Sequence, residues 1–159
     1  MFVFNSADHK YMQEALQEAR RAAADDEVPA GAVVVDPYGE IVGRGRNQVI
    51  SLSDPTAHAE VLAIRQAAAQ AGNYRLSGCV IFSTLEPCAM CFMAAVHARL
   101  SRVIFGAPEP RWGAAGSLIN LAGLPGLNHN LDVAGGLEAD EARKLITDFF
   151  RQKRRPSPA

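Results

Sequence analysis

The 159-residue sequence has too few cysteines for a disulfide framework and no excess of one charge. Its three cysteines are an odd number, and Cys88 and Cys91 stand three positions apart, a spacing typical of metal or redox sites. Sixteen Lys and Arg balance 17 Asp and Glu, so the net charge of −1 gives no overall basic field for nucleic acid. The cations are unevenly placed, however, because residues 151–155 alone carry +4.

Long apolar runs are also missing. The longest, residues 88–96, has nine residues, far below the roughly 20 that span a bilayer. Residues 1–8 lack the basic region and apolar run of a signal peptide, so we expect no membrane partner and a reducing, cytoplasmic location. The 48% hydrophobic and 21% charged fractions are ordinary for a folded chain. We expect one domain over residues 1–155 and a disordered tail at 156–159.

Hydrophobic periodicity predicts alternating helices and strands. The expected helices cover residues 9–24, 55–71, 87–98 and 137–153, and the expected strands cover 32–35, 41–45, 79–83 and 102–105. In the closing helix, Phe149 and Phe150 are expected to face the core. The glycine-rich stretch 106–126 is too long for a structureless loop, so it is functional or contains a short helix. This alternation predicts a three-layer α/β/α sandwich with helices on both faces of one sheet.

Two short motifs carry the chemistry: His58-Ala59-Glu60 and Pro87-Cys88-Ala89-Met90-Cys91, each at a predicted helix start. Cys88 and Cys91 project from the same face of a first helical turn. Two thiolates and one imidazole suit Zn²⁺, and three protein ligands leave the fourth tetrahedral position for water, as in a catalytic site. The positive end of the helix dipole favours the thiolate forms.

Glu60 is predicted to act beside the metal rather than on it. On a regular helix, residues two apart point about 200° away from each other, so His58 and Glu60 share a site only if His58 lies at an irregular helix mouth. The residues 54–56, Asp-Pro-Thr, predict such a mouth. Glu60 would then be a carboxylate placed to take a proton from water and pass it on.

Each of these motifs also occurs in proteins without a catalytic metal. His-x-Glu or Cys-x-x-Cys alone is common without a metal, whereas the two together, each at a helix start, match the signature of zinc nucleobase deaminases. A structural zinc would need a fourth ligand, but His97 lies roughly 240° around the helix from Cys91. We interpret His97 as a structural histidine and Cys79, in a strand, as a small buried apolar residue.

Beyond these motifs, the sequence resembles the bacterial tRNA-specific adenosine deaminases of the cytidine deaminase superfamily. The resemblance covers nearly the whole chain, in order, through residues 27–33, 54–60, 73–76, 84–91, 113–117, 127–130 and 148–151. The zinc motifs mark only the superfamily, whereas Gly-Ala-Ala-Gly-Ser at 113–117 and Asp-Phe-Phe-Arg at 148–151 point to the tRNA branch.

The resemblance implies one zinc ion per subunit and conversion of adenosine to inosine at the wobble position of a tRNA anticodon. Water would attack carbon 6 of adenine while Glu60 protonates ring nitrogen 1 and then the departing ammonia. An anticodon loop already exposes its bases, so placing one in a pocket costs little. The resemblance also implies a mixed central sheet of about five strands, and a homodimer whose subunits both shape each site.

Matching positions give further expected contacts. Asn47 would contact the purine edge, Leu85 would form an apolar wall, and the backbone N–H groups near Ala59 and Cys88 would point into the pocket. Phe150, Arg151 and Arg154 would contact the anticodon stem-loop. Cations at a helix end can simply complement its dipole, but four among residues 151–155 exceed that need and favour phosphate contact.

The sequence departs from the family where an Asp is usual, because Glu109 stands there between two prolines. Its carboxylate is one methylene longer and still able to accept from a ribose hydroxyl, and Trp112 follows in the same loop. Two rival functions remain open. One is a deaminase of a free nucleobase or nucleoside of the guanine or cytosine type. The other is a non-catalytic zinc module that binds RNA.

Overall fold

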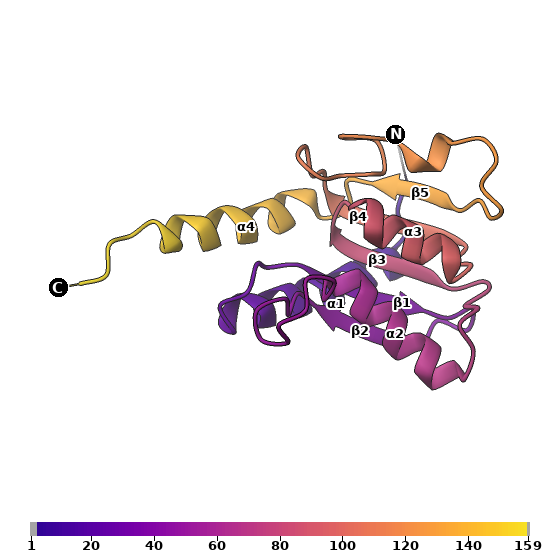
Figure 1. The fold of residues 1–159 in the computed structure, drawn as a ribbon, viewed down its shortest axis with the longest axis horizontal. Coiled ribbons are helices and arrows are strands. Elements are labelled where there is room, and N and C mark those ends of the chain that lie inside the picture. Colours follow the sequence, from indigo (N-terminus) through magenta and orange to yellow (C-terminus); the bar gives the residue numbers. More distant parts are fainter. Residues whose placement is uncertain (1–2, 159) are drawn as a thin grey trace.

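The structure, a computed structural model, describes residues 3–158 and has a five-stranded mixed sheet between two layers of helices. The strands are β1 (Gly31–Val35), β2 (Ile41–Arg46), β3 (Val80–Leu85), β4 (Arg102–Ala107) and β5 (Asp132–Gly135). The helices are α1 (Ser6–Ala24), α2 (Ala59–Ala71), α3 (Ala89–His97), α4 (Ala139–Lys153) and a 3₁₀ turn, η1 (Leu121–Gly123). The predicted sandwich is therefore confirmed (Figure 1).

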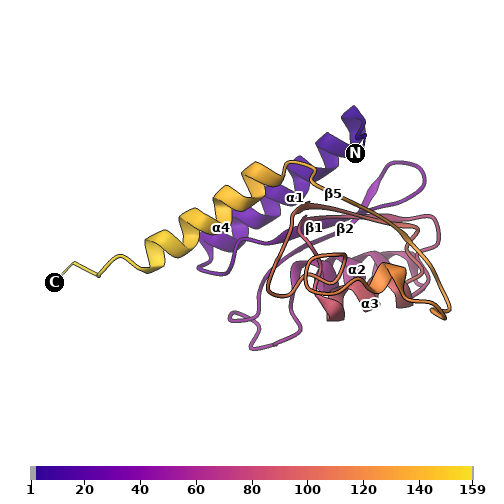
Figure 2. The same ribbon diagram turned by 90° about the horizontal axis from the view of Figure 1, so that it is seen from above.

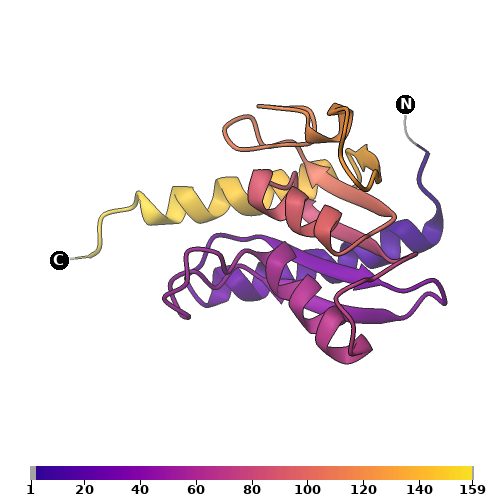
Figure 3. The same cartoon turned by 45° about the vertical axis from the view of Figure 1, so that its right-hand side comes forward.

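The sheet order is β2-β1-β3-β4-β5, with β1 antiparallel to both neighbours and β3, β4 and β5 parallel. Alternate side chains of β1 enter opposite layers: Val34 packs with α2 and α3, and Val33 with α1 and α4. Figures 1 and 3 show α2 and α3 side by side, and Figure 2 shows α1 and α4 together on the other side of the sheet. Burial on both faces explains why every residue of β1 is buried.

One edge of the sheet gathers the loops that carry the predicted motifs. The parallel strands β3 and β4 end there, leading into Glu86-Pro87-Cys88 and into residues 108–112. Because β1 is antiparallel to β3, with Ala32 opposite Ser83, β1 begins at the same edge and β2 ends there. Segments distant in sequence thus converge where strand ends open onto helix starts, a usual position for a ligand site in α/β folds.

Glycines let the helices lie directly on the sheet. A Cβ at Gly45 of β2 would lie 2.1 Å from the carbonyl oxygen of Ala59, and one at Gly43 would lie 2.2 Å from that of Ala63. Only the absence of a side chain at these positions allows the backbone of α2 to approach so closely. The start of α2 is therefore held at a short, fixed height above β2.

Helix α4 differs from the amphipathic core helix that was predicted. Its one fully buried residue is Ala142, while Phe150 is 42% exposed, so the prediction that Phe150 faces the core is wrong. The helix runs along α1 through polar pairs such as Arg20 with Glu141, and it continues past the sheet (Figures 1 and 2). Its second half consequently projects beyond the sheet, where Phe150 is left exposed.

The remaining sequence predictions concern the long loop and the chain end. The stretch 106–126 contains the short helix η1, as expected, and β5 follows it. Residues 156–158 follow α4 without a helix or strand, and residue 159 of the predicted tail lies outside the described residues. Among the residues described, no helix has both the length and the apolar character to cross a membrane.

Candidate active site

The first turns of α2 and α3 bring the two motifs together. His58 is the N-cap of α2, with an extended backbone (φ −74°, ψ 152°), and Cys88 is the N-cap of α3 in a similar conformation (φ −72°, ψ 174°). His58 thus lies just before the first helical turn of α2 and not within it. This is the position that the sequence analysis predicted if His58 and Glu60 share one site. Cys91, within the first turn of α3, is buried beside Cys88.

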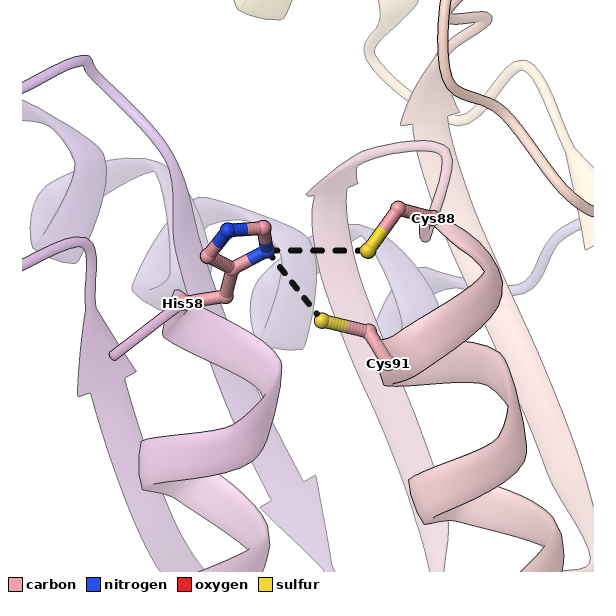
Figure 4. A group of neighbouring side chains, drawn as sticks. All are labelled: His58, Cys88 and Cys91. Atoms are coloured by element: carbon pink, nitrogen blue, oxygen red, sulfur yellow. Dashed lines mark hydrogen bonds between the residues drawn. The ribbon is translucent and has the colours of Figure 1, made fainter. Parts of the chain in front are cut away.

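The side chains of His58, Cys88 and Cys91 form a compact set of ligands (Figure 4). The Nδ1 atom of His58 lies 3.6 Å from Sγ of Cys88 and 3.4 Å from Sγ of Cys91. Zinc bonds of about 2.1 Å to nitrogen and 2.3 Å to sulfur, meeting at a tetrahedral angle, separate these donors by about 3.6 Å. The three residues therefore fit a tetrahedral zinc ion, and of the described residues they alone form such a group.

The pKa shifts within this group favour a thiolate at Cys88. The hydrogen bond from Cys91, with a further contribution from His58, lowers the pKa of Cys88 to about 4, although burial opposes ionisation. The neighbouring Cys88 and burial raise the pKa of Cys91. The hydrogen bond with Cys88 also raises the pKa of His58. At neutral pH one thiolate is ready for a metal, and a second forms when binding displaces the proton of Cys91.

Glu60 is a buried carboxylate, 7% exposed, in the first turn of α2. The hydroxyl of Ser83 on β3 donates to its Oε1 atom at 2.7 Å, which fixes one carboxylate oxygen. Glu60 does not belong to the metal-ligand group, yet it lines the same cavity as His58 and Cys88. A carboxylate held there can exchange protons with a molecule bound in that cavity.

The cavity has a volume of about 460 Å³, within the usual range for small-molecule sites. Seven of the residues predicted from the sequence line it: Asn47, His58, Ala59, Glu60, Leu85, Cys88 and Glu109. Apart from Glu109, they come from the ends of β2 and β3 and the starts of α2 and α3. The structure thus brings together a metal-ligand group, an acid–base carboxylate, a side-chain amide and an apolar wall.

Comparison with known proteins identifies this combination. Residues 5–107 match the model of the cytidine and deoxycytidylate deaminase zinc-binding region. The chain belongs to this deaminase family. The tRNA-specific adenosine deaminase of Haemophilus influenzae is 43% identical over 92% of this chain and 85% of its own. That of Bacillus subtilis is 40% identical over 96% of this chain and 94% of its own.

Solved structures agree with the fold of this deaminase. One of them comes from biochemical and structural studies of A-to-I editing by tRNA:A34 deaminases at the wobble position of transfer RNA. It superposes on this chain with a TM-score of 0.82. It is 41% identical over 86% of this chain and 98% of its own. The guanine deaminase of Bacillus subtilis is 27% identical over 98% of both chains, with a TM-score of 0.63.

A longer relative is also similar. The tRNA(Ile)-lysidine synthase of Deinococcus deserti is 45% identical over 150 residues, but the present chain spans only 28% of its length. The similarity covers 92% of the present chain, so the deaminase unit matches one part of that larger protein.

Three of the predicted substrate contacts lie away from the cavity of this deaminase. Phe150 packs edge-on against Phe149, with ring centroids 5.3 Å apart, and Arg151 lies 3.6 Å from Asp148. Arg154 is the C-cap of α4 and is exposed. The structure therefore places these residues on a projecting helix, outside the pocket itself.

The first of two residues that sequence reasoning missed is Glu27, which is 1% exposed and holds the loop after Asn47. Its Oε1 accepts from the N–H of Ile50 at 2.9 Å, and its Oε2 accepts from the N–H and hydroxyl of Ser51 at 3.1 and 3.0 Å. Burial opposes ionisation of Glu27, but these hydrogen bonds outweigh it and lower its pKa. Glu27 thus fixes the segment that carries Asn47.

Glu86 plays the same part on the opposite side of the pocket and is 4% exposed. Its Oε2 accepts from the N–H of Glu109 at 3.0 Å and from the hydroxyl of Ser117, and its Oε1 accepts from the N–H groups of Ala115 and Ser117, both at 3.0 Å. These bonds outweigh the effect of burial and lower the pKa of Glu86. The available signal was an acidic residue directly after a buried apolar strand, which needs internal partners.

Proposed function

We propose that this deaminase converts adenosine to inosine at the wobble position of a tRNA anticodon. The observation that carries the proposal is the cavity in which Glu60 and Asn47 accompany the ligands His58 and Cys88. The identity of about 40% to tRNA-specific adenosine deaminases over most of the chain supports the substrate class. The reaction consumes one water and releases one ammonia.

His58, Cys88 and Cys91 would hold the zinc ion, which acts as a Lewis acid and makes water a stronger nucleophile near neutral pH. The residues of the chain then bind the base and move the protons. Glu60, held through one oxygen by Ser83, takes the proton from the attacking water and delivers it to ring nitrogen 1 of adenine. It carries the second proton to the amino group at carbon 6, which leaves as ammonia when its bond to carbon breaks.

The remaining wall of the cavity would orient the base. The side chain of Asn47 can both donate to and accept from the purine edge, and Leu85 provides apolar contact with the ring. The N–H groups near Ala59 and Cys88 lie at helix starts, where backbone donors lack partners within the helix. Glu109 would accept a hydrogen bond from the ribose.

The wider proposal concerns partners and organisation. We propose that residues 1–155 form a single deaminase domain, that it acts as a homodimer, and that it works in the cytoplasm, where zinc-binding thiols stay reduced. Exposed apolar side chains beyond the pocket, such as Leu118 at 56% and Ile119 at 44%, support association with a second copy. Light scattering on the purified protein tests the dimer.

The decisive experiment incubates zinc-loaded protein with an anticodon stem-loop that carries adenosine at the wobble position, and separately with free adenosine, cytidine and guanine. We expect inosine in the RNA and no ammonia from the free compounds. Deamination of free guanine or cytidine at a comparable rate would instead favour the small-molecule rival. Binding of the RNA without ammonia release would favour a non-catalytic zinc module.

A further inference from the structure

Trp112 has no part in the proposed chemistry, yet it lines the mouth of the cavity. It is the only tryptophan in the chain, and 69% of its surface is exposed. An indole ring is the largest apolar side chain, so leaving it in water at the entrance to a binding site forgoes a large gain from burial. Such a residue is expected to be covered when the site is in use.

The backbone that carries Trp112 is held on both sides although its side chain is free. The N–H of Arg111 donates to Oε1 of Glu109 at 2.9 Å, and the N–H of Gly113 donates to the carbonyl of Glu109 at 2.7 Å. The N–H of Glu109 in turn donates a hydrogen bond to Oε2 of Glu86 at 3.0 Å. A Cβ at Gly113 would lie 2.4 Å from Cδ of Glu86, so the loop is pressed against this buried carboxylate.

The same loop is tied to the start of α3. Gly113 forms an isolated bridge with Cys88, and the N–H of Ala114 donates to the carbonyl of Pro87 at 2.8 Å. Two prolines, Pro108 and Pro110, further limit the conformations of the segment before Trp112. The backbone of Trp112 therefore stands at a fixed place relative to the metal ligands, so that only the indole side chain has to be ordered on binding.

The surroundings of Trp112 indicate what covers it. Charged groups are usually depleted from the centre of protein–protein interfaces, whereas here Glu109 and the exposed Arg111 lie within three positions of Trp112 in the same loop. An exposed aromatic side chain and an exposed guanidinium in one loop form a combination with which proteins bind single-stranded nucleic acid, through stacking on a base and attraction to its phosphate.

We propose that Trp112 is a stacking platform for a nucleobase directly adjacent to the target base, outside the deamination pocket. This inference rests on the proposed function and makes Trp112 a specificity residue, because a free nucleoside has no neighbouring base to stack. The loop 108–113, fixed by Glu86, sets the place of that second base relative to the first.

Because the chain has one tryptophan, its fluorescence reports on this contact directly. Zinc-loaded protein with Glu60→Gln, which blocks turnover, is titrated with the anticodon stem-loop. Three further stem-loops each carry an abasic site, at the target, at its 5′ neighbour or at its 3′ neighbour. We expect quenching by the intact RNA and by the target-abasic RNA, and loss of quenching with one of the two neighbour-abasic RNAs.

Three results would overturn the stacking role. The first is RNA binding, seen by gel shift, with unchanged fluorescence. The second is quenching lost only when the target base is absent, which would place Trp112 on that base. The third is fluorescence that changes with protein concentration before RNA is added, which would show that a second copy of the chain covers the ring.

Kinetics on the stem-loop provides an independent readout in protein with native Glu60. Trp112→Ala is expected to raise KM about 5-fold to 150-fold, the range for loss of one stacked base, with a smaller change in kcat. Trp112→Phe should restore most of the loss. Tyr38→Ala, which removes another exposed aromatic (91%) from the far end of β1, is the matched control and should leave KM unchanged.

The outcomes separate the two proposals. Absence of inosine from every RNA treated with the wild-type protein would contradict the proposed function and the stacking role together. Inosine formation with the same KM for the wild type and Trp112→Ala would contradict the stacking role alone.

Discussion

The floor and the rim of the cavity are built in different ways. The floor, made of His58, Glu60 and Cys88, comes from the starts of two helices packed on one sheet. The rim, with Asn47 and Glu109, comes from loops that depend on single buried carboxylates. Regular structure therefore holds the residues proposed to act in the chemistry, and isolated side chains hold those proposed to contact the substrate, so the two roles should be separable by mutation.

The two sides of the rim also differ from each other. Glu86 uses both oxygens twice, with two donors on each, while Glu27 has one donor on Oε1 and two on Oε2. The loop on the Glu86 side therefore depends more strongly on its carboxylate than the loop on the Glu27 side does. Replacing either oxygen of Glu86 would leave two hydrogen-bond donors unpaired.

The largest effect should come from the floor. In Glu60→Gln the amide oxygen can still accept from Ser83, but the amide group cannot take up and release protons. We therefore expect kcat on the stem-loop to fall by about 100-fold to 10,000-fold. Zinc content, from metal analysis, and RNA affinity, from gel shifts, should stay at wild-type levels. Ammonia release at the wild-type rate would contradict the role of Glu60.

Breaking the rim should affect stability in proportion to the hydrogen bonds lost. Glu86→Gln turns an NH₂ group toward two donors in either amide orientation, and should lower the free energy of unfolding by about 2 to 4 kcal/mol. Glu27→Gln can direct its NH₂ toward Ile50 alone and should lose about 1 to 2 kcal/mol. Urea denaturation of zinc-loaded proteins at neutral pH measures both, and equal losses would contradict the comparison.

The same carboxylates predict a pH dependence of stability. The pKa values of Glu27 and Glu86 are lowered from 4.5, so their contribution is fully present above that pH and is lost as the pH falls through the lower, folded-state pKa. The difference in urea midpoint between the wild type and Glu86→Gln should therefore shrink below about pH 4.5. A difference that persists unchanged into this acidic range would show that the charge of Glu86 is not what stabilises the loop.

The smallest effect should come from the projecting helix. Arg151→Ala with Arg154→Ala removes two exposed cations, so KM for the stem-loop should rise about 2-fold to 10-fold at low salt, and the effect should fade as salt is added. Arg143→Ala, on the same helix and paired with Asp140 at 3.2 Å, is the matched control. A salt-independent loss in the double variant would exclude a phosphate contact.

The sequence predicted the floor because the floor is local. The spacing of Cys88 and Cys91 and the helix start before Glu60 are visible within a few residues, and the structure brings them together as expected. Glu27 and Glu86 could not be assigned in this way, because their partners lie 23 to 31 positions away in irregular loops. Their partners depend on how the loops fold, which periodicity does not encode.

The wrong prediction for Phe150 has a different physical cause. Its helical spacing correctly indicated a helix, but periodicity cannot tell whether the sheet extends far enough to cover each turn. The strand β5 was not located either, because its four residues include a single fully buried side chain and show no clear alternation. The number of strands was inferred from the family resemblance.

The close contact at Gly45 means that the spacing between the metal ligands depends on a residue that has no side chain. His58 lies at the start of α2, whereas Cys88 and Cys91 lie at the start of α3. Of these two helices, α2 is the one that packs against β2 at Gly45. Any side chain at Gly45 would have to push Ala59 outward, because even its Cβ would lie 2.1 Å from that carbonyl. His58 would move with Ala59 while Cys88 and Cys91 stayed in place. A methyl group at Gly45, outside the cavity, would thus increase the distance between His58 and the two cysteines.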